Sequence, residues 1–154
     1  MTTQEETLRR LVVELRILEG TADALQSRIN LVSATLTELR ISTMTLEGME
    51  KEREGALLFV PIGGGSYVKS KLESVDRVIV GIGAGVAIER TIKEAMENIG
   101  NRIADLEKTR NTLQQQLGQV VGKIEEGRNK FQELSAKLSE EARRSDVRKT
   151  ERGT

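Results

Sequence analysis

Two long stretches of the chain repeat apolar residues at alternating intervals of three and four, and a shorter apolar block separates them. This heptad pattern is typical of a coiled-coil seam and is narrower than the apolar stripe of a globular helix. It predicts one helix over about residues 4–50 and another over about 91–142. The first stripe is Leu8, Leu11, Leu15, Leu18, Ala22, Leu25, Ile29, Val32, Leu36, Leu39, Thr43 and Leu46. The second is Ile92, Met96, Ile99, Ile103, Leu106, Arg110, Leu113, Leu117, Val120, Ile124, Gly127, Phe131, Leu134 and Leu138.

Folding the two helices antiparallel is the simplest way to bury both stripes, because they are similar in length and about 40 residues join them. A capping box, a threonine followed three positions later by a glutamate, fits both helix starts. The candidates are Thr2–Glu5 or Thr3–Glu6, and Thr91–Glu94. One register pairs Leu46 with Met96, Leu36 with Leu106, Leu11 with Phe131 and Leu8 with Leu134. A half-heptad shift is the alternative.

The middle block, residues 56–89, predicts two β-hairpins. β-Branched and large apolar residues alternate with glycine clusters there, and Pro61 suits a strand end or an edge. Because residues 57–60 and 78–82 are apolar at consecutive positions, both faces of the strands need cover, and two helices do not supply it. We therefore expect strands of other chains to cover them. The candidate assembly residues are Leu58, Phe59, Val60, Ile62, Tyr67, Val68, Val78, Ile79, Val80, Ile82, Val86 and Ile88.

Composition excludes most catalytic and metal chemistry. The chain has 154 residues without Cys or His, which removes thiolate and imidazole sites. The glycine clusters at 63–65 and 81–85 match neither a Walker A loop nor a dinucleotide loop, so hairpin turns explain them better. The carboxylates lie on predicted helix surfaces. We expect no enzyme, no catalytic residue, no metal and no cofactor.

Charge and hydropathy exclude some classes of binding partner. The net charge is zero and aromatic residues make up 2% of the chain, so neither a basic surface nor a stacking platform for nucleic acid is present. No apolar run reaches the roughly 20 residues that span a bilayer. No signal peptide is recognisable, so we expect a cytoplasmic protein that binds neither nucleic acid nor membrane. The basic tail, residues 143–154, has no apolar stripe and is expected to be disordered.

Two features of the second stripe leave alternatives open. Arg110 is either a register-setting polar residue or a snorkelling arginine packed on Val32. The glycines at 118, 122 and 127 weaken the helix by about 0.8–1 kcal/mol each relative to alanine, which is either drift or a way to loosen that end. The apolar residues of this end close the seam or bind a partner. They are Leu8, Leu11, Val12, Val13, Phe131, Leu134 and Leu138.

The order helix, two hairpins, helix, together with two segments of the middle block, resembles the alpha-type subunit of archaeal prefoldin. The segments run from Leu57 to Val68 and from Val80 to Arg90, continuing into Ala95–Glu97. Two hairpins rather than one distinguish the alpha type from the beta type. The resemblance implies a single prefoldin-like domain over 1–154, of α+β class: a long antiparallel two-helix coiled coil whose hairpins join an inter-subunit β-barrel.

The resemblance also implies a function. It implies a hexamer of two alpha-type and four beta-type subunits, an ATP-independent holdase that captures unfolded or nascent polypeptides and passes them to a group II chaperonin. The seven apolar residues at the coil end would then be the client-binding tips. The alternative is a homo-oligomeric or filament-forming prefoldin-like protein whose coil is a structural spacer.

Overall fold

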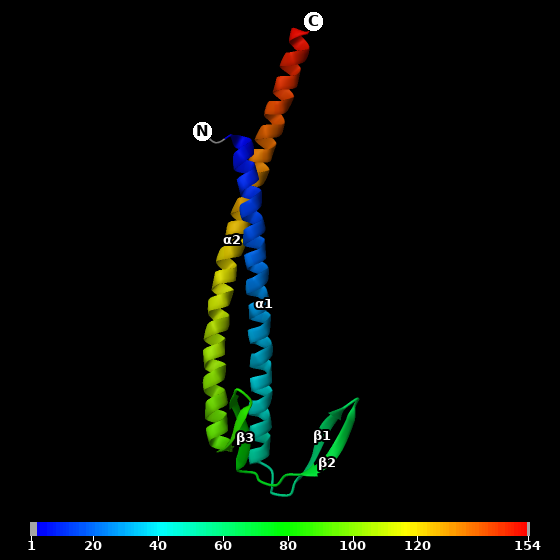
Figure 1. The fold of residues 1–154 in the computed structure, drawn as a ribbon, viewed down its shortest axis with the longest axis vertical. Coiled ribbons are helices and arrows are strands. Elements are labelled where there is room, and N and C mark those ends of the chain that lie inside the picture. The colour runs from blue at the N-terminus through cyan, green and yellow to red at the C-terminus, as the bar shows by residue number, and fades with distance from the viewer. Residues whose placement is uncertain (1–2, 154) are drawn as a thin grey trace. The chain divides into compact units, whose positions relative to one another are not determined.

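The computed structural model describes residues 3–153 and has two long helices with two β-hairpins between them (Figure 1). The elements are α1 (Gln4–Glu50), β1 (Leu57–Gly63), β2 (Ser66–Lys71), β3 (Arg77–Gly83), β4 (Val86–Thr91) and α2 (Ile92–Arg152). The predicted order of elements is confirmed. The described residues divide into two compact units. The first holds those up to Leu31 and from Asn111 onward, and the second holds Val32–Arg110.

Capping boxes start both helices. The Glu6 backbone N–H donates to Thr3 Oγ1 at 3.2 Å, and the Thr3 N–H donates to Glu6 Oε2 at 3.3 Å. The same reciprocal pair joins Thr91 and Glu94 at 3.1 and 3.2 Å. Each box satisfies backbone donors that the first helical turn leaves without a partner. The alternative first box would need Thr2, which lies outside the described residues.

The second unit has an apolar core where the helices meet next to the hairpins. Its buried members come from both helices, and Val78 and Val80 of β3 pack against them. Each fully buried Leu or Ile contributes about 1.5–3 kcal/mol relative to an exposed one. One face of the β3–β4 hairpin therefore rests on this unit's own helices. The buried residues are Leu39, Leu46, Ile92, Ala95 and Ile99.

The two hairpins form separate two-stranded antiparallel sheets with the same turn design. The turn after β1 has Gly64 and Gly65 at φ +59° and +74°, and the turn after β3 has Ala84 and Gly85 at φ +50° and +74°. A bulge precedes each turn, where the pairing register shifts. Among residues 3–153, Ala84 is the one non-glycine residue with positive φ.

In the first unit, the helices approach closely at Gly127. A Cβ atom on this buried glycine would lie 2.7 Å from Leu15 Cδ2 and 3.7 Å from Leu11 Cδ1. The Leu15 side chain therefore fills the space that Gly127 leaves. The contact agrees with the register that pairs Leu11 with Phe131. Arg128 Nη2 adds an ion pair to Glu19 Oε1 at 2.9 Å on the surface.

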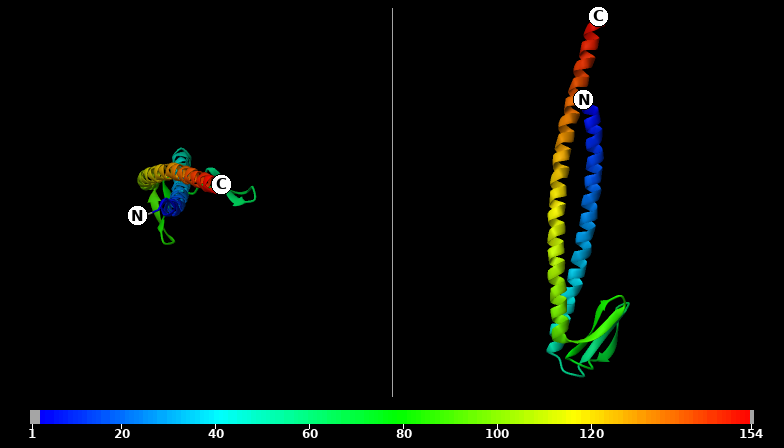
Figure 2. Two further views of the ribbon diagram at one scale, coloured as in Figure 1. Left: turned by 90° about the horizontal axis from the view of Figure 1, so that it is seen from above. Right: turned by 60° about the vertical axis from the view of Figure 1, so that its left-hand side comes forward.

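The structure does not show the disordered tail that we predicted from residue 143. Helix α2 continues through Arg152 and passes the first turn of α1 within the first unit (Figures 1 and 2). Arg, Lys, Glu and Ala favour helix even where nothing covers them. Arg144 also pairs with Glu140 at 2.7 Å, one helical turn earlier. The predicted helix end at residue 142 was wrong for the same reason.

Candidate functional site

All seven predicted tip residues lie in the first unit. Leu8, Leu11, Val12 and Val13 come from α1, and Phe131, Leu134 and Leu138 come from α2. Val13 is 56% exposed, whereas the other six are half-buried. Half-burial of the seam residues follows from their position, because the facing helix covers one side of each. The tips therefore offer a partly covered apolar seam and one exposed valine, Val13.

A groove of about 540 Å³ brings the two helices' apolar residues together at the tip. Leu11 of α1 and Leu134 of α2 both line it, and charged side chains form its edges. Lys137 Nζ lies 3.4 Å from Glu133 Oε1, an exposed pair that contributes little to stability. An apolar floor between charged edges can take up an aliphatic side chain while the neighbouring polar backbone stays in water.

Sequence reasoning missed one apolar residue of this region. Ile17 is 64% exposed and lies four positions after Val13, hence on the same side of α1. The heptad pattern gave Ile17 no role. The four-residue spacing from Val13, which also lies outside the seam, was the signal that could have identified it. Val13 and Ile17 together extend the apolar surface along α1.

The predicted assembly residues divide between the hairpins by exposure. On β1–β2, Leu58 is half-buried, and Phe59, Val60, Ile62, Tyr67 and Val68 are exposed. This hairpin therefore leaves apolar side chains uncovered on both faces, as expected.

On β3–β4, Val78, Val80 and Ile88 are half-buried, whereas Ile79, Ile82 and Val86 are exposed. The expectation that both faces of residues 78–82 need cover from other chains is corrected for one face. The helices of the second unit already pack against that face through Val78 and Val80.

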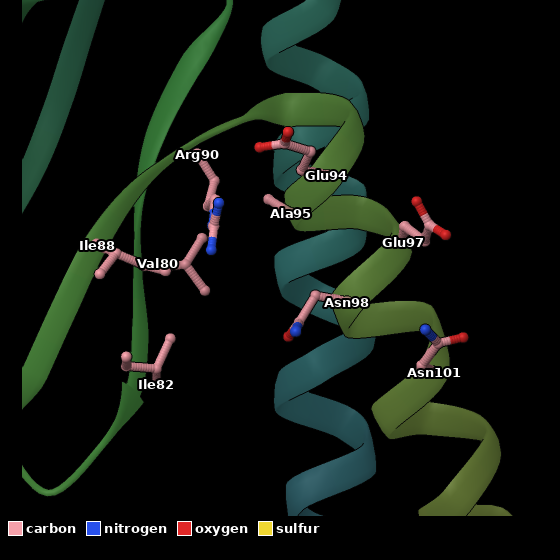
Figure 3. A pocket seen from close by; sticks show the side chains of 9 residues that line it. All are labelled: Val80, Ile82, Ile88, Arg90, Glu94, Ala95, Glu97, Asn98 and Asn101. Atoms are coloured by element: carbon pink, nitrogen blue, oxygen red, sulfur yellow. The ribbon is translucent and has the colours of Figure 1, made fainter.

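A hollow of about 390 Å³ separates the tip of β3–β4 from α2 (Figure 3). Figure 3 shows Val80 and Ile82 of β3 across from Asn98 of α2. The strand wall carries aliphatic side chains and Arg90, and the α2 wall carries amides and carboxylates. Glu94 already accepts a hydrogen bond in the capping box. Such a hollow can take an amphipathic segment.

Among the described residues, we looked for metal-binding clusters and for side chains with a shifted pKa. No cluster of three or more His, Cys, Asp or Glu side chains could hold a metal ion in residues 3–153. One carboxyl has a shifted pKa: a hydrogen bond from the Ser74 hydroxyl, then a backbone hydrogen bond and the Arg77 charge, hold the pKa of Asp76 below its usual value. Asp76 is exposed and belongs to a turn, so this shift marks local structure.

Neither long helix has an apolar window that could cross a membrane, over the residues that the structure describes. Both carry charged side chains along their outer faces.

Comparison with known proteins gives a consistent result. The family profile "Prefoldin: Prefoldin subunit" matches residues 18–137. Prefoldin subunit alpha of Methanopyrus kandleri is 39% identical over 113 residues, which are 73% of this chain and 72% of that protein. The cryo-EM structure of filamentous PFD from Methanocaldococcus jannaschii matches with TM-score 0.65 and 30% identity, over 73% of this chain and 93% of that chain.

The crystal structure of the prefoldin beta subunit from Thermococcus strain KS-1 matches over 86% of this chain and 96% of that chain. Its TM-score is 0.57 and its identity is 16%, so this likeness supports the fold alone. Together, the matches cover both helices and both hairpins.

Proposed function

Because this chain belongs to the prefoldin family, we propose that it is the alpha-type subunit of a cytoplasmic, ATP-independent holdase. In this proposal, its tips capture unfolded or nascent polypeptides, and the assembly passes them to a group II chaperonin. The family is one of non-enzymatic chaperones, and we propose that this chain likewise catalyses no reaction and needs no cofactor.

The observation that carries this proposal is the apolar tip. Leu11 and Leu134 line one groove from opposite helices, and Val13, on another side of α1, is exposed. Burial of apolar surface gives about 25 cal/mol per Å², so one tip binds an unfolded segment only weakly. Several tips on one platform raise the effective concentration of binding surface and strengthen capture without any new contact.

We further propose assembly with beta-type subunits, two alpha-type chains with four beta-type chains, through the hairpins. Each hairpin is a two-stranded sheet, which is marginal in water by itself and leaves unpaired backbone groups at its edges. The exposed side chains of β1–β2 need cover on both faces. Strands from neighbouring subunits that close a barrel would satisfy both needs.

Substitution in the tip tests client capture. Replacing Phe131, Leu134 and Leu138 with Ser should leave the assembly intact and weaken its suppression of the aggregation of a denatured protein. A loss of only about 1.4 kcal/mol of contact free energy already weakens binding tenfold. Native mass spectrometry and light scattering measure the two properties.

The matched control is Val121→Ser, which removes an exposed aliphatic side chain from α2 outside the tip residues. This variant should suppress aggregation as the unchanged chain does. Equal suppression by the triple variant, in an intact assembly, would contradict the assignment of the α2 tip residues as a client site.

A second candidate is self-assembly into a homo-oligomer or filament. The observation in its favour is the 30% identity to filamentous PFD, which this chain matches over 93% of that chain's length. In this case the coil would act as a spacer and the hairpins would join identical copies. The size of the particle formed without a beta-type partner separates the two candidates.

A further inference from the structure

Helix α1 carries a second apolar stripe in the first unit, on the side opposite to the seam. Its residues recur at intervals of four and three between positions 13 and 31, as those of the seam do, but they point the other way around the helix. All six are exposed, and none is charged. We call them the outer stripe, and they are Val13, Ile17, Gly20, Ala24, Ser27 and Leu31.

The outer stripe presents large aliphatic side chains in addition to those that close the seam. Ile17 is 64% exposed and Leu31 is 70% exposed, whereas Leu25 and Ile29 of the seam are buried along the same part of the helix. A helix side opposite to the buried one ordinarily carries polar or charged residues. The outer stripe departs from this rule over about 27 Å of helix, at 1.5 Å per residue.

The corresponding side of α2 follows the rule. Its positions opposite to the seam have the same spacing in this unit, but they hold polar and small residues without any large aliphatic side chain. They are Thr112, Gln115, Gln119, Gly122, Glu126, Asn129, Glu133 and Ala136. The outer stripe is therefore a feature of α1 alone and does not belong to the coil in general.

The middle of the outer stripe allows close approach. A Cβ atom on Gly20 would meet nothing within 4 Å, so no contact among residues 3–153 requires a glycine there. Glycine is nevertheless a poor helix former. Together with Ala24 and Ser27, it lowers the surface between the larger side chains at either end. Small residues at the crossing point let two helices approach closely, since the side chains at a contact set the distance between the axes.

The charges beside the outer stripe match those of a second copy of α1 in parallel orientation. In a parallel coiled coil, a residue on one flank of the stripe faces the residue five positions later on the partner's other flank. Arg9 then faces Glu14 and Asp23 faces Arg28, and two-fold symmetry repeats each pair. No ion pair within residues 3–153 uses any of these four side chains.

An antiparallel pairing of the same stripe is less well matched. It would bring Glu14 to Arg28, but it would also set Asp23 against Asp23 of the other copy. Like charges placed together across a contact are unfavourable. It would further place Ser27 against Ile17 instead of against its own copy. The charges therefore favour the parallel orientation.

We propose that the outer stripe of α1 packs in parallel on the outer stripe of a second copy of this chain, with Asp23 paired to Arg28 across the contact. The contact is isologous, because the same surface serves both copies. It goes beyond the proposed function, since it depends on neither client capture nor the hairpins. It spans fewer than three heptads, so we expect a weak association that a covalent trap detects best.

Cysteine cross-linking tests the contact, because the chain has no cysteine of its own. In the proposed arrangement, residue 27 of one copy lies against residue 27 of the other, within the roughly 7 Å between Cα atoms that a disulfide spans. The full chain with Ser27→Cys should form a disulfide-linked dimer under mild oxidation, and non-reducing electrophoresis measures the rate. The matched control is Ser135→Cys, at an exposed serine of α2, which should cross-link at least tenfold more slowly.

Charge reversal in the Ser27→Cys chain tests the pairing. Asp23→Arg or Arg28→Asp alone places like charges together at both symmetric pairs, and each should slow cross-linking about tenfold. The two reversals together should restore the rate. Residues five apart on one helix do not face each other, so the rescue reports on contact with the second copy. Circular dichroism checks that the helices persist.

Equal rates for Ser27→Cys and Ser135→Cys, or no rescue by the double reversal, would overturn the inference. Faster cross-linking in a mixture of Ile17→Cys and Ser27→Cys chains than in either chain alone would also overturn it, because this result indicates an antiparallel contact. An absence of any cross-link at residue 27 would exclude a second copy as the occupant and leave the outer stripe to a helix of another protein.

Discussion

At the scale of the residue, Ala84 is the position under the most evident backbone strain. It occupies a left-handed conformation at φ +50°, and the equivalent position of the other hairpin is Gly64. For L-residues this conformation costs roughly 1–2 kcal/mol, whereas glycine adopts it freely. Ala84→Gly should therefore raise the free energy of unfolding by up to about 1 kcal/mol, as measured by urea denaturation.

Ala87→Gly is a suitable control, because Ala87 lies inside β4 and needs no left-handed backbone. It should lower stability, since glycine in a strand interior has more conformational freedom to lose. If both changes shifted stability in the same direction, strain at Ala84 would not be the reason.

Asp76 gives a prediction about pH. Its pKa is depressed, first by the Ser74 hydroxyl, so its contacts stabilise the fold above the unfolded pKa. That contribution disappears as the pH falls through the folded pKa. Ser74→Ala should raise the pKa of Asp76 toward its usual value, which an NMR titration of the carboxyl carbon measures. Ser145→Ala, whose hydroxyl bonds the Ala142 carbonyl instead, should leave the titration unchanged.

Residue types indicated some of these details and not others. The glycines at 63–65, 83 and 85 were expected in turns, and all have positive φ. Nothing in the sequence predicted that Ala84 has a positive φ, since alanine has no preference for the left-handed conformation. Five of the predicted tip residues follow from the heptad, whereas Val12 and Val13 were predicted as extra apolar residues outside it. The exposure of Ile17 depends on where the facing helix lies.

At the scale of the element, the glycines of α2 differ in what surrounds them. A Cβ at Gly118 or Gly122 would meet nothing within 4 Å, whereas one at Gly127 would lie 2.7 Å from Leu15 Cδ2. Alanine gains about 0.8–1 kcal/mol over glycine in an open helix interior. Gly118→Ala and Gly122→Ala should therefore each stabilise the chain by about that amount.

Gly127→Ala should gain less than either or lower stability, because Leu15 must move from its packed position. Thermal unfolding of the three variants under one condition gives the comparison. An equal gain at all three positions would mean that Leu15 repacks without loss. Combining Gly127→Ala with Leu15→Ala makes room for the new methyl group and should reduce the steric penalty between the two sites.

For the helices, the heptad periodicity predicted the seam but not the C-terminal end of α2. The seam and both capping boxes were readable, because heptad spacing and the threonine–glutamate pairs are local signals. The end of α2 was not, since a surface helix such as 143–152 has no apolar stripe to mark it. Its helical form depends on backbone propensity and on ion pairs such as Glu140–Arg144.

At the scale of the whole molecule, assembly is the decisive property. We expect native mass spectrometry to find a two-plus-four hexamer when this chain is co-expressed with a single-hairpin beta-type subunit. The physical reason is that both hairpins expose apolar side chains that only other strands can cover fully.

Large, heterogeneous particles formed by the chain alone, and unchanged by a beta-type partner, would instead favour the filament candidate. Equal expression of both chains is the control, because an excess of either one hides the stoichiometry. The fold class was predictable from one sequence. From the sequence, we predicted that the hairpin side chains need cover. The geometry of the assembly that would cover them was not predictable, since it depends on residues of other chains.

The unpaired strand edges have a consequence for the cell. A freshly made copy without partners displays aliphatic side chains and open backbone edges, the same chemistry that its assembled form is proposed to recognise in other proteins. An orphaned subunit therefore resembles a client. Balanced synthesis of the subunits would protect the cell from it, and finished assemblies would be well suited to hold any surplus.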